Sequence, residues 1–352
     1  MHTSFQSLFL LMFVTAAVSA AVFASEGSAK PVRLAVVGHA DETHFTKAAV
    51  AQLERVAAEK GIEVTVAPAP LAGTTEFAWD LMLMPVRSLA NRVPALEILE
   101  LPFFYPSLDA VRANLDGALG ERLDAEANER GWKVVAFWDE GMHIFSGIKR
   151  FDRVRNLKAR EFLITRPDPV AERQFAYWKA DARRINPENR EAVLRECLIA
   201  NRAATLQEVV REQLYRVHLT MSLTNHRYEG WVVVAPRGRW LQFDASRRQG
   251  LAEVFKQTTV WQRRDVEARE AAAREKLRQS RMTLYDVDST QREAFRAALP
   301  DWAELLSDSL SEEQKRELIA MASAGTAAFL SAATPTQASP DSQRHERDQG
   351  GS

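Results

Sequence analysis

The sequence contains one cysteine, almost no net charge and no long apolar run beyond its N-terminus. Cys197 has no second cysteine to pair with, which excludes an intramolecular disulfide and a cysteine metal cluster. The 46 lysines and arginines are balanced by 47 acidic residues, for a net charge of −1. Nucleic-acid binding needs a clustered basic excess, so we expect no nucleic-acid partner.

The motifs of the common enzyme classes are also missing. No Gly-x-Gly-x-x-Gly or Walker-type loop joins a predicted strand to a helix, and no Gly-x-Ser-x-Gly elbow marks a hydrolase. The histidines form neither a His-x-x-x-His nor a His-Glu-x-x-His pattern, so no metal site is indicated. The sequence therefore predicts a protein that is not an enzyme and that binds no cofactor.

The N-terminus is typical of an export signal. Leu8–Val18 is apolar and small residues follow it, with cleavage motifs that end at Ala20 and at Ala24. We predict a signal peptide over residues 1–24 and a periplasmic mature protein. Because no lysine or arginine precedes the apolar core, an uncleaved membrane anchor remains the alternative.

The chain then alternates predicted strands and helices. Val32–Val37 is expected to be a buried strand, His44–Lys60 a helix that ends at Gly61, and Ile62–Val66 a second strand. This β-α-β order is typical of a parallel sheet covered by helices. We therefore assign the chain to the α/β class.

A second unit follows the same plan. Leu99–Phe104 is expected to be the end of a buried strand, followed by one amphipathic helix from Ser107 to Gly131. Its apolar residues recur every fourth position, from Val111 to Leu123. Trp132–Trp138 is rich in residues that favour strands and is predicted to return to the sheet.

The last third of the chain is predicted to be mainly helical. Asp244 caps a highly charged helix over about residues 246–280, which would be about 50 Å long at 1.5 Å per residue. A C-terminal helix is predicted within residues 306–331. Residues 332–352 are dominated by Thr, Ser, Pro, Gln and Gly, and we expect a disordered tail there.

Four segments resemble the solute-binding subunits of TRAP (tripartite ATP-independent periplasmic) transporters. They read LELPFFYPSLDAVRANLDG, FWDEGMHIFSGIKR, VRNLK and YRVHLTMSLTNHRYEGWVVVAPRGRW, and the resemblance covers about residues 32–305. It implies a two-lobe periplasmic binding protein-like fold with a long helix that spans both lobes. It also implies capture of a small organic acid and delivery to TRAP membrane permease subunits.

The resemblance also divides the chain into lobes. Lobe one is expected to comprise residues 31–144 and 228–260, and lobe two residues 145–227 and 261–305. The chain would cross between them near Phe145 and Tyr228, with two lobes rather than a single continuous sheet.

Several ligand-contacting positions of that family are altered in this sequence. The family's carboxylate-binding arginine corresponds to Leu163 or Ile164, and Arg166 is the nearest cation along the chain. A family asparagine is replaced by Glu140 and a second family arginine by His143. Because an arginine fork matches a carboxylate, we take Arg166 as the first candidate for the ligand clamp.

The remaining candidates lie at or near other family positions. Asn201 and Arg202 lie close to the position where the family's asparagine is replaced by Ala204. Three aromatic residues, which could equally belong to the core, fall near the expected cleft or hinge: Trp138, Tyr228 and Trp231. The altered positions leave a second hypothesis open, a derived family member that acts as a sensor or interaction module without solute transport.

Overall fold

The computed structural model describes residues 30–38, 46–69, 78–164, 168–184 and 201–333. The predicted signal peptide, Cys197, the candidate Arg166 and nearly all of the predicted C-terminal tail lie outside these residues. Within the described part of the chain, no helix is both long and apolar enough to cross a membrane.

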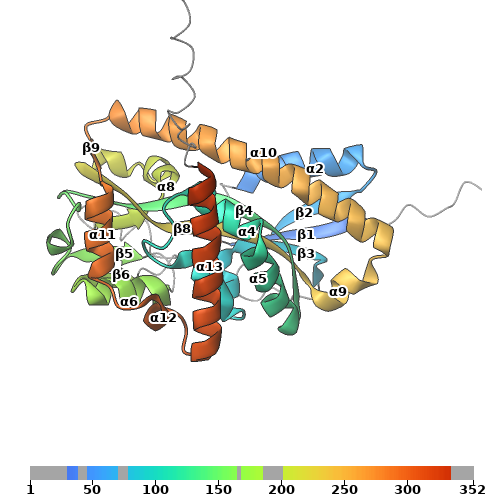
Figure 1. Ribbon diagram of the computed structural model, residues 1–352. Coiled ribbons are helices and arrows are strands. Elements are labelled where there is room, and N and C mark those ends of the chain that lie inside the picture. The colour runs from blue at the N-terminus through green and yellow to red at the C-terminus, as the bar shows by residue number, and fades with distance from the viewer. Residues whose placement is uncertain (1–29, 39–45, 70–77, 165–167, 185–200, 334–352) are drawn as a thin grey trace, which may run out of the picture.

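One mixed sheet organises the described residues (Figure 1). Its strand order is β2-β1-β3-β8-β4-β7-β5-β6, and β9 pairs with β8 outside this path. The strands are β1 Val32–Val37, β2 Val64–Ala69, β3 Leu81–Pro85, β4 Trp132–Gly147, β5 Glu161–Ile164, β6 Asp181–Arg184, β7 Asn201–Ala204, β8 Thr220–Pro236 and β9 Thr283–Asp286. We call β1–β3 with their helices the first half, and β5–β7 with their helices the second half.

Two long antiparallel strands join the halves. β4 has 16 residues and β8 has 17, and they pair from Trp132–Pro236 to Gly147–Thr220. β3 pairs with one end of β8, whereas β7 pairs with the other end of β4. The expectation that the sheet would not be continuous is therefore wrong, because two strands long enough to serve both halves carry the hydrogen bonding across.

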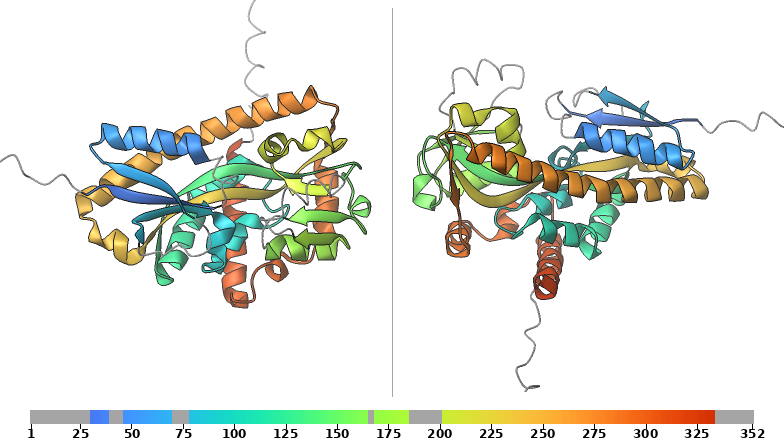
Figure 2. Two further views of the ribbon diagram at one scale, coloured as in Figure 1. Left: turned by 180° about the vertical axis from the view of Figure 1, so that it is seen from behind. Right: turned by 90° about the horizontal axis from the view of Figure 1, so that it is seen from above.

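The helices pack on both faces of this sheet (Figure 2). The α-helices are α2 Lys47–Glu59, α3 Val86–Ala90, α4 Leu108–Leu115, α5 Ala118–Glu129, α6 Pro169–Tyr177, α8 Leu206–Arg211, α9 Arg237–Gln242, α10 Ala245–Arg278, α11 Ser289–Ala297, α12 Trp302–Leu305 and α13 Glu312–Ala333. Short 3₁₀ helices are η3 Pro94–Glu100, η4 Val154–Asn156 and η6 Leu214–Arg216.

The predicted long helix is present as α10. Asp244 accepts the Arg247 N–H and caps its start, and the helix continues unbroken for 34 residues. It contacts α2 of the first half, β4 in the middle, and α8 and β9 at its far end. Figure 1 shows it lying along the whole length of the molecule. The prediction of one helix that spans both halves is therefore confirmed.

Two local predictions are wrong. The predicted strand end at Leu99–Phe104 is instead the end of η3 and a turn, in which Phe103 takes a positive φ of 58°. The single predicted helix is two helices, α4 and α5, which meet at Gly117 in an extended conformation. At this break Gly120 approaches the Leu115 carbonyl so closely that a Cβ would lie 2.0 Å from that oxygen, so the position requires glycine.

Candidate ligand-binding site

A cluster of buried charged side chains lies where the two halves meet. It comprises Arg87, His143, Asp168, Arg227 and Glu229, which we call the cleft cluster. Arg87 belongs to α3, which follows β3 directly, and His143 lies on β4. Arg227 and Glu229 lie on β8, and Asp168 caps the N-terminus of α6 in the second half. The cluster therefore connects both halves through side chains.

Two arginines share the carboxylate of Asp168. Nη1 of Arg87 donates to Oδ2 at 3.1 Å, and Nη1 of Arg227 donates to the same oxygen at 2.6 Å. Oδ1 accepts the Ala171 N–H at 2.9 Å. Burial alone would raise the pKa of Asp168, but the charges of Arg227 and Arg87 outweigh it and hold the pKa at about 2. Asp168 is therefore ionised at neutral pH.

His143 connects the second arginine to the second carboxylate. Nη2 of Arg227 donates to Nδ1 of His143 at 3.2 Å, so the imidazole proton lies on Nε2, which faces Oε2 of Glu229 at 3.0 Å. Burial and the nearby Arg227 charge lower the pKa of His143 well below its usual value. Arg87 also pairs with Oε2 of Glu229. The contacts thus close into a ring of two guanidinium groups, two carboxylates and one neutral imidazole.

A small cavity of about 20 Å³ lies against this ring. A water molecule needs about 10–15 Å³, so the cavity holds a water but no organic acid. Nitrogen atoms around it lack hydrogen-bond partners among the described residues, namely Nε of Arg87, Arg202 and Arg227 and Nε2 of His226. Unpaired buried polar atoms are rare and costly, so these nitrogens indicate a place where acceptor oxygens could bind.

Arg202 supplies a third guanidinium group to the cavity wall. It lies on β7, directly opposite Leu163 of β5 in the parallel register. Its Nη1 pairs with Oε2 of Glu212 at 2.7 Å, and only 3% of its side chain is exposed. A cation therefore stands one strand away from Leu163, one of the two positions where the resemblance places the family's carboxylate-binding arginine.

Two of the sequence candidates, His143 and Arg202, line the cavity. Glu140 accepts the Trp231 indole N–H at 2.8 Å, so these two candidates bind each other. Asn201 donates to the Glu161 carbonyl, at a distance of 2.9 Å, and does not line the cavity. The structure therefore brings together only part of the predicted set.

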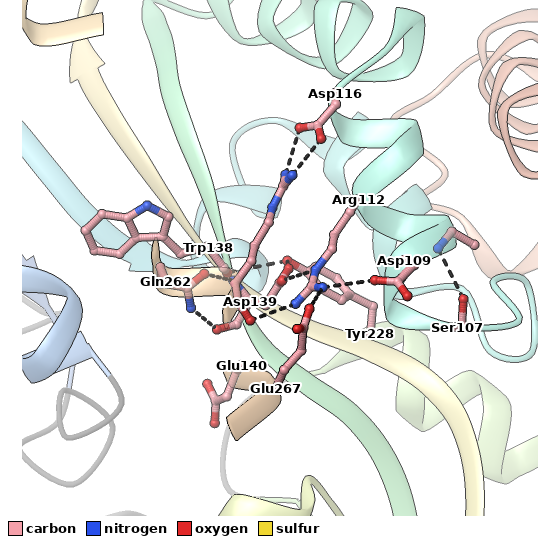
Figure 3. Close-up of polar contacts among 12 residues, drawn as sticks. Ser107, Asp109, Arg112, Asp116, Trp138, Asp139, Glu140, Tyr228, Gln262 and Glu267 are labelled. Carbon is pink, nitrogen blue, oxygen red and sulfur yellow. Dashed lines mark hydrogen bonds and ion pairs between the residues drawn. The ribbon is translucent and has the colours of Figure 1, made fainter. Parts of the chain in front are cut away.

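The other two candidates, Trp138 and Tyr228, form hydrogen bonds to α10 and β4. The Trp138 indole N–H donates to Thr259 Oγ1 on α10 at 3.1 Å. The Tyr228 hydroxyl donates to Asp139 Oδ1 at 3.1 Å. Asp139 lies on β4 next to Glu140, and it is the centre of a second buried polar group (Figure 3).

We call this group the Arg112 network; it comprises Arg112, Asp139, Tyr228, Gln262 and Glu267. Nε of Arg112 donates to Oδ2 of Asp139 at 2.7 Å, and its Nη1 pairs with Glu267. Gln262 accepts the Asp139 N–H and donates to the Asp139 carbonyl, at 3.1 and 2.6 Å. The network joins α4, β4, β8 and α10, as Figure 3 shows.

The sequence candidates lack two arginines and two carboxylates of the cleft cluster, and all of these except Arg87 carried a signal in the sequence. Arg227 and Glu229 stand inside the strand Thr220–Pro236, which is otherwise mostly apolar and buried. Charged residues are seldom buried without a partner, so their presence in a central strand indicates an ionic site. Asp168 directly precedes Pro169, a combination typical of a helix N-terminus.

Comparisons with known proteins agree with this fold. The model of the DctP family, bacterial extracellular solute-binding protein family 7, matches residues 72–308. The C4-dicarboxylate-binding protein DctB of Bacillus subtilis is 22% identical over 228 residues, which are 64% of this chain and 65% of that protein. The C4-dicarboxylate-binding periplasmic protein DctP of Vibrio cholerae is 25% identical over 46% of this chain and 49% of its own length. The chain thus spans about half to two thirds of the length of these curated relatives.

Solved structures match over more of the chain. A TRAP periplasmic solute-binding protein from Desulfovibrio salexigens with bound orotic acid has a TM-score of 0.73 at 17% identity, covering 85% of this chain and 99% of that one. One from Shewanella oneidensis with bound succinate has a TM-score of 0.71 at 17% identity, covering 84% and 100%. These likenesses confirm the predicted two-lobe α/β fold class.

Proposed function

The chain belongs to family 7 of the bacterial extracellular solute-binding proteins, and we propose that it captures a small organic acid for a TRAP-type permease. The observation that carries this proposal is the set of buried arginine nitrogens around the cavity that lack hydrogen-bond partners among the described residues. Arginine forks bind carboxylates through paired, charge-assisted hydrogen bonds. The curated relatives named for C4-dicarboxylates and the neighbour with bound succinate support the same ligand class.

We infer that Arg202 and Arg227 hold the solute's carboxylate and that His143 contributes a polar contact. Arg202 is the first choice, because it stands beside Leu163, lines the cavity and has an Nε without a hydrogen-bond partner among the described residues. Arg166 stays a candidate from the sequence, since it lies outside the described residues. The cavity is too small for a solute, so binding requires the halves to separate or the cleft cluster to rearrange.

The location, role and partners of the protein belong to the same proposal. We propose the predicted export signal and a periplasmic location, a role in transport without catalysis, and permease subunits as partners. We also keep the lobe boundaries near Phe145 and Tyr228 as proposed. No observation favours the second hypothesis, a sensor without a transported solute, and the ligand experiment below separates the two.

Calorimetry on the mature protein with succinate, galacturonate and orotate tests the proposal. We expect binding of at least one acid, and Arg202→Ala should weaken it about 30-fold to several-thousand-fold, because an unpaired buried carboxylate costs about 2–5 kcal/mol. Arg202→Lys keeps a charge beside Glu212 and should retain folding with reduced affinity.

The exposed Arg278→Ala serves as the control and should leave the affinity unchanged. A folded wild-type protein that binds none of the three acids would contradict the proposal. Tight binding unaffected by both Arg202 substitutions would place the site elsewhere.

A further inference from the structure

Asp168 occupies the position between Arg87 and Arg227 that an acidic ligand would take. Its Oδ2 accepts from both guanidinium groups, and only 1% of its side chain is exposed. The two arginines come from α3 and β8, whereas Asp168 comes from α6 in the second half. The Arg87–Asp168 pair therefore crosses directly from one half to the other.

We propose that Asp168 is a built-in occupant of the anion site, which a solute carboxylate displaces from Arg87 and Arg227. This inference rests on the proposed function and deepens it, because it states how the same site is regulated. The cleft is held closed by the protein's own ion pair, so affinity for an acid is set by competition with Asp168.

Space supports this competition. A cavity of about 20 Å³ holds a water only, so an acid can reach the arginines only if a resident group leaves. Glu229 and Arg227 lie on β8, two residues apart, and His143 lies on the neighbouring strand β4. Asp168 precedes α6 in the second half, whereas these three residues lie on the two long strands, so Asp168 separates from them when the halves move apart.

Charge supports it as well. Arg87 and Arg227 already face three carboxylates, Asp168, Glu229 and, 3.7 Å from Nε of Arg87, Glu100, while the imidazole of His143 is neutral. A solute carboxylate that entered while Asp168 stayed would add a further negative charge to two guanidinium groups that already face three. Like charges in a buried site repel strongly, so the solute and Asp168 exclude each other.

Asp168 also caps α6, so the test must distinguish the effect of losing its negative charge from the effect of losing its capping hydrogen bond. Its Oδ1 accepts the Ala171 N–H at 2.9 Å. Asparagine caps a helix about as well as aspartate does, so Asp168→Asn removes the charge and keeps the cap. Asp288→Asn is the matched control, because Asp288 caps α11 in the same way, accepts the Gln291 N–H, and is exposed.

The experiment measures the affinity of the full mature protein for succinate and galacturonate by calorimetry. We expect Asp168→Asn to bind the acid at least tenfold more tightly than the wild type, and Asp288→Asn to match the wild type. Circular dichroism checks that each variant is folded. Asp168→Ser keeps a capping oxygen and gives the same test if the asparagine variant does not fold.

Each other outcome overturns the inference. Equal affinities in the wild type and Asp168→Asn would show that Asp168 does not compete, while solute capture itself would stand. Weaker binding by Asp168→Asn would mean that Asp168 helps to hold the solute. If neither protein binds an acid, both the inference and the proposed function fail.

Discussion

The molecule contains two buried arginine–carboxylate groups on the same pair of long strands, and they differ in how completely their hydrogen bonds are satisfied. In the Arg112 network every guanidinium nitrogen has a partner, since Nε donates to Asp139, Nη1 pairs with Asp109 and Glu267, and Nη2 donates to the Arg263 carbonyl. In the cleft cluster neither Nε of Arg87 nor Nε of Arg227 has a hydrogen-bond partner among the described residues, although Nε of Arg87 lies 3.7 Å from the Glu100 carboxylate. A satisfied network holds elements together, whereas an unsatisfied one beside a cavity is suited to a ligand.

The alternation of strand β8 separates the two groups. Tyr228 points to Asp139, while its neighbours Arg227 and Glu229 point to the cleft cluster. Successive side chains of a strand lie on opposite faces, which explains this division. On β4 the register shift between Asp139 and Gly141 changes the face, so that Asp139 and His143 join different groups although four residues apart.

The largest effect is expected from breaking the satisfied network. Arg112→Ala leaves Asp139 buried without its charged partner, and we expect a loss of about 3–5 kcal/mol in the free energy of unfolding. Urea denaturation measures it. Arg55→Ala removes an exposed pair with Glu59 on α2 and should cost less than about 1 kcal/mol. A loss as small as that of the control would contradict the structural role of the network.

A smaller loss of stability is expected when the pH is lowered and the cleft cluster is protonated. The folded-state pKa of Asp168 is about 2, below its ordinary 3.8, so its stabilisation is fully present above about pH 4 and is lost as the pH falls through about 2. At 1.36 kcal/mol per pKa unit this amounts to about 2 kcal/mol.

Denaturation of wild type and Asp168→Asn at pH 4, 3 and 2 measures this dependence. Carboxylates far from the cleft cluster titrate equally in both proteins, so the difference between the two curves reports the charge of Asp168 and its effect on the cluster. The wild type should lose about 2 kcal/mol more than the variant over this range. Parallel curves would show that Arg87 and Arg227 do not stabilise the ionised form.

The sequence predicted the scaffold better than the site. The alternation of strands and helices and the charge pattern of α10 are local signals, and both reappear in the structure. The ion pair of Arg87 with Asp168 joins two residues that are 81 positions apart in the chain, and no local pattern encodes it. The break at Gly117 was also missed, because the spacing of apolar residues continues from α4 into α5.

The smallest change in stability is expected at Tyr228. It gives the most direct comparison of the two buried groups, because Tyr228 and Arg227 are neighbours on one strand. Tyr228→Phe removes a hydroxyl that donates to Asp139 and leaves the ring in the core. We expect a loss of about 1 kcal/mol in unfolding free energy, the typical net contribution of one hydrogen bond, and no change in acid affinity. Arg227→Lys, one residue earlier, loses the fork that contacts both Asp168 and His143 and should weaken acid binding. Urea denaturation measures the stability of the two variants, and calorimetry measures their affinity for the acid. If Tyr228→Phe weakened binding as much as Arg227→Lys, the two groups would act as one site, and the division between a structural network and a binding cluster would be wrong.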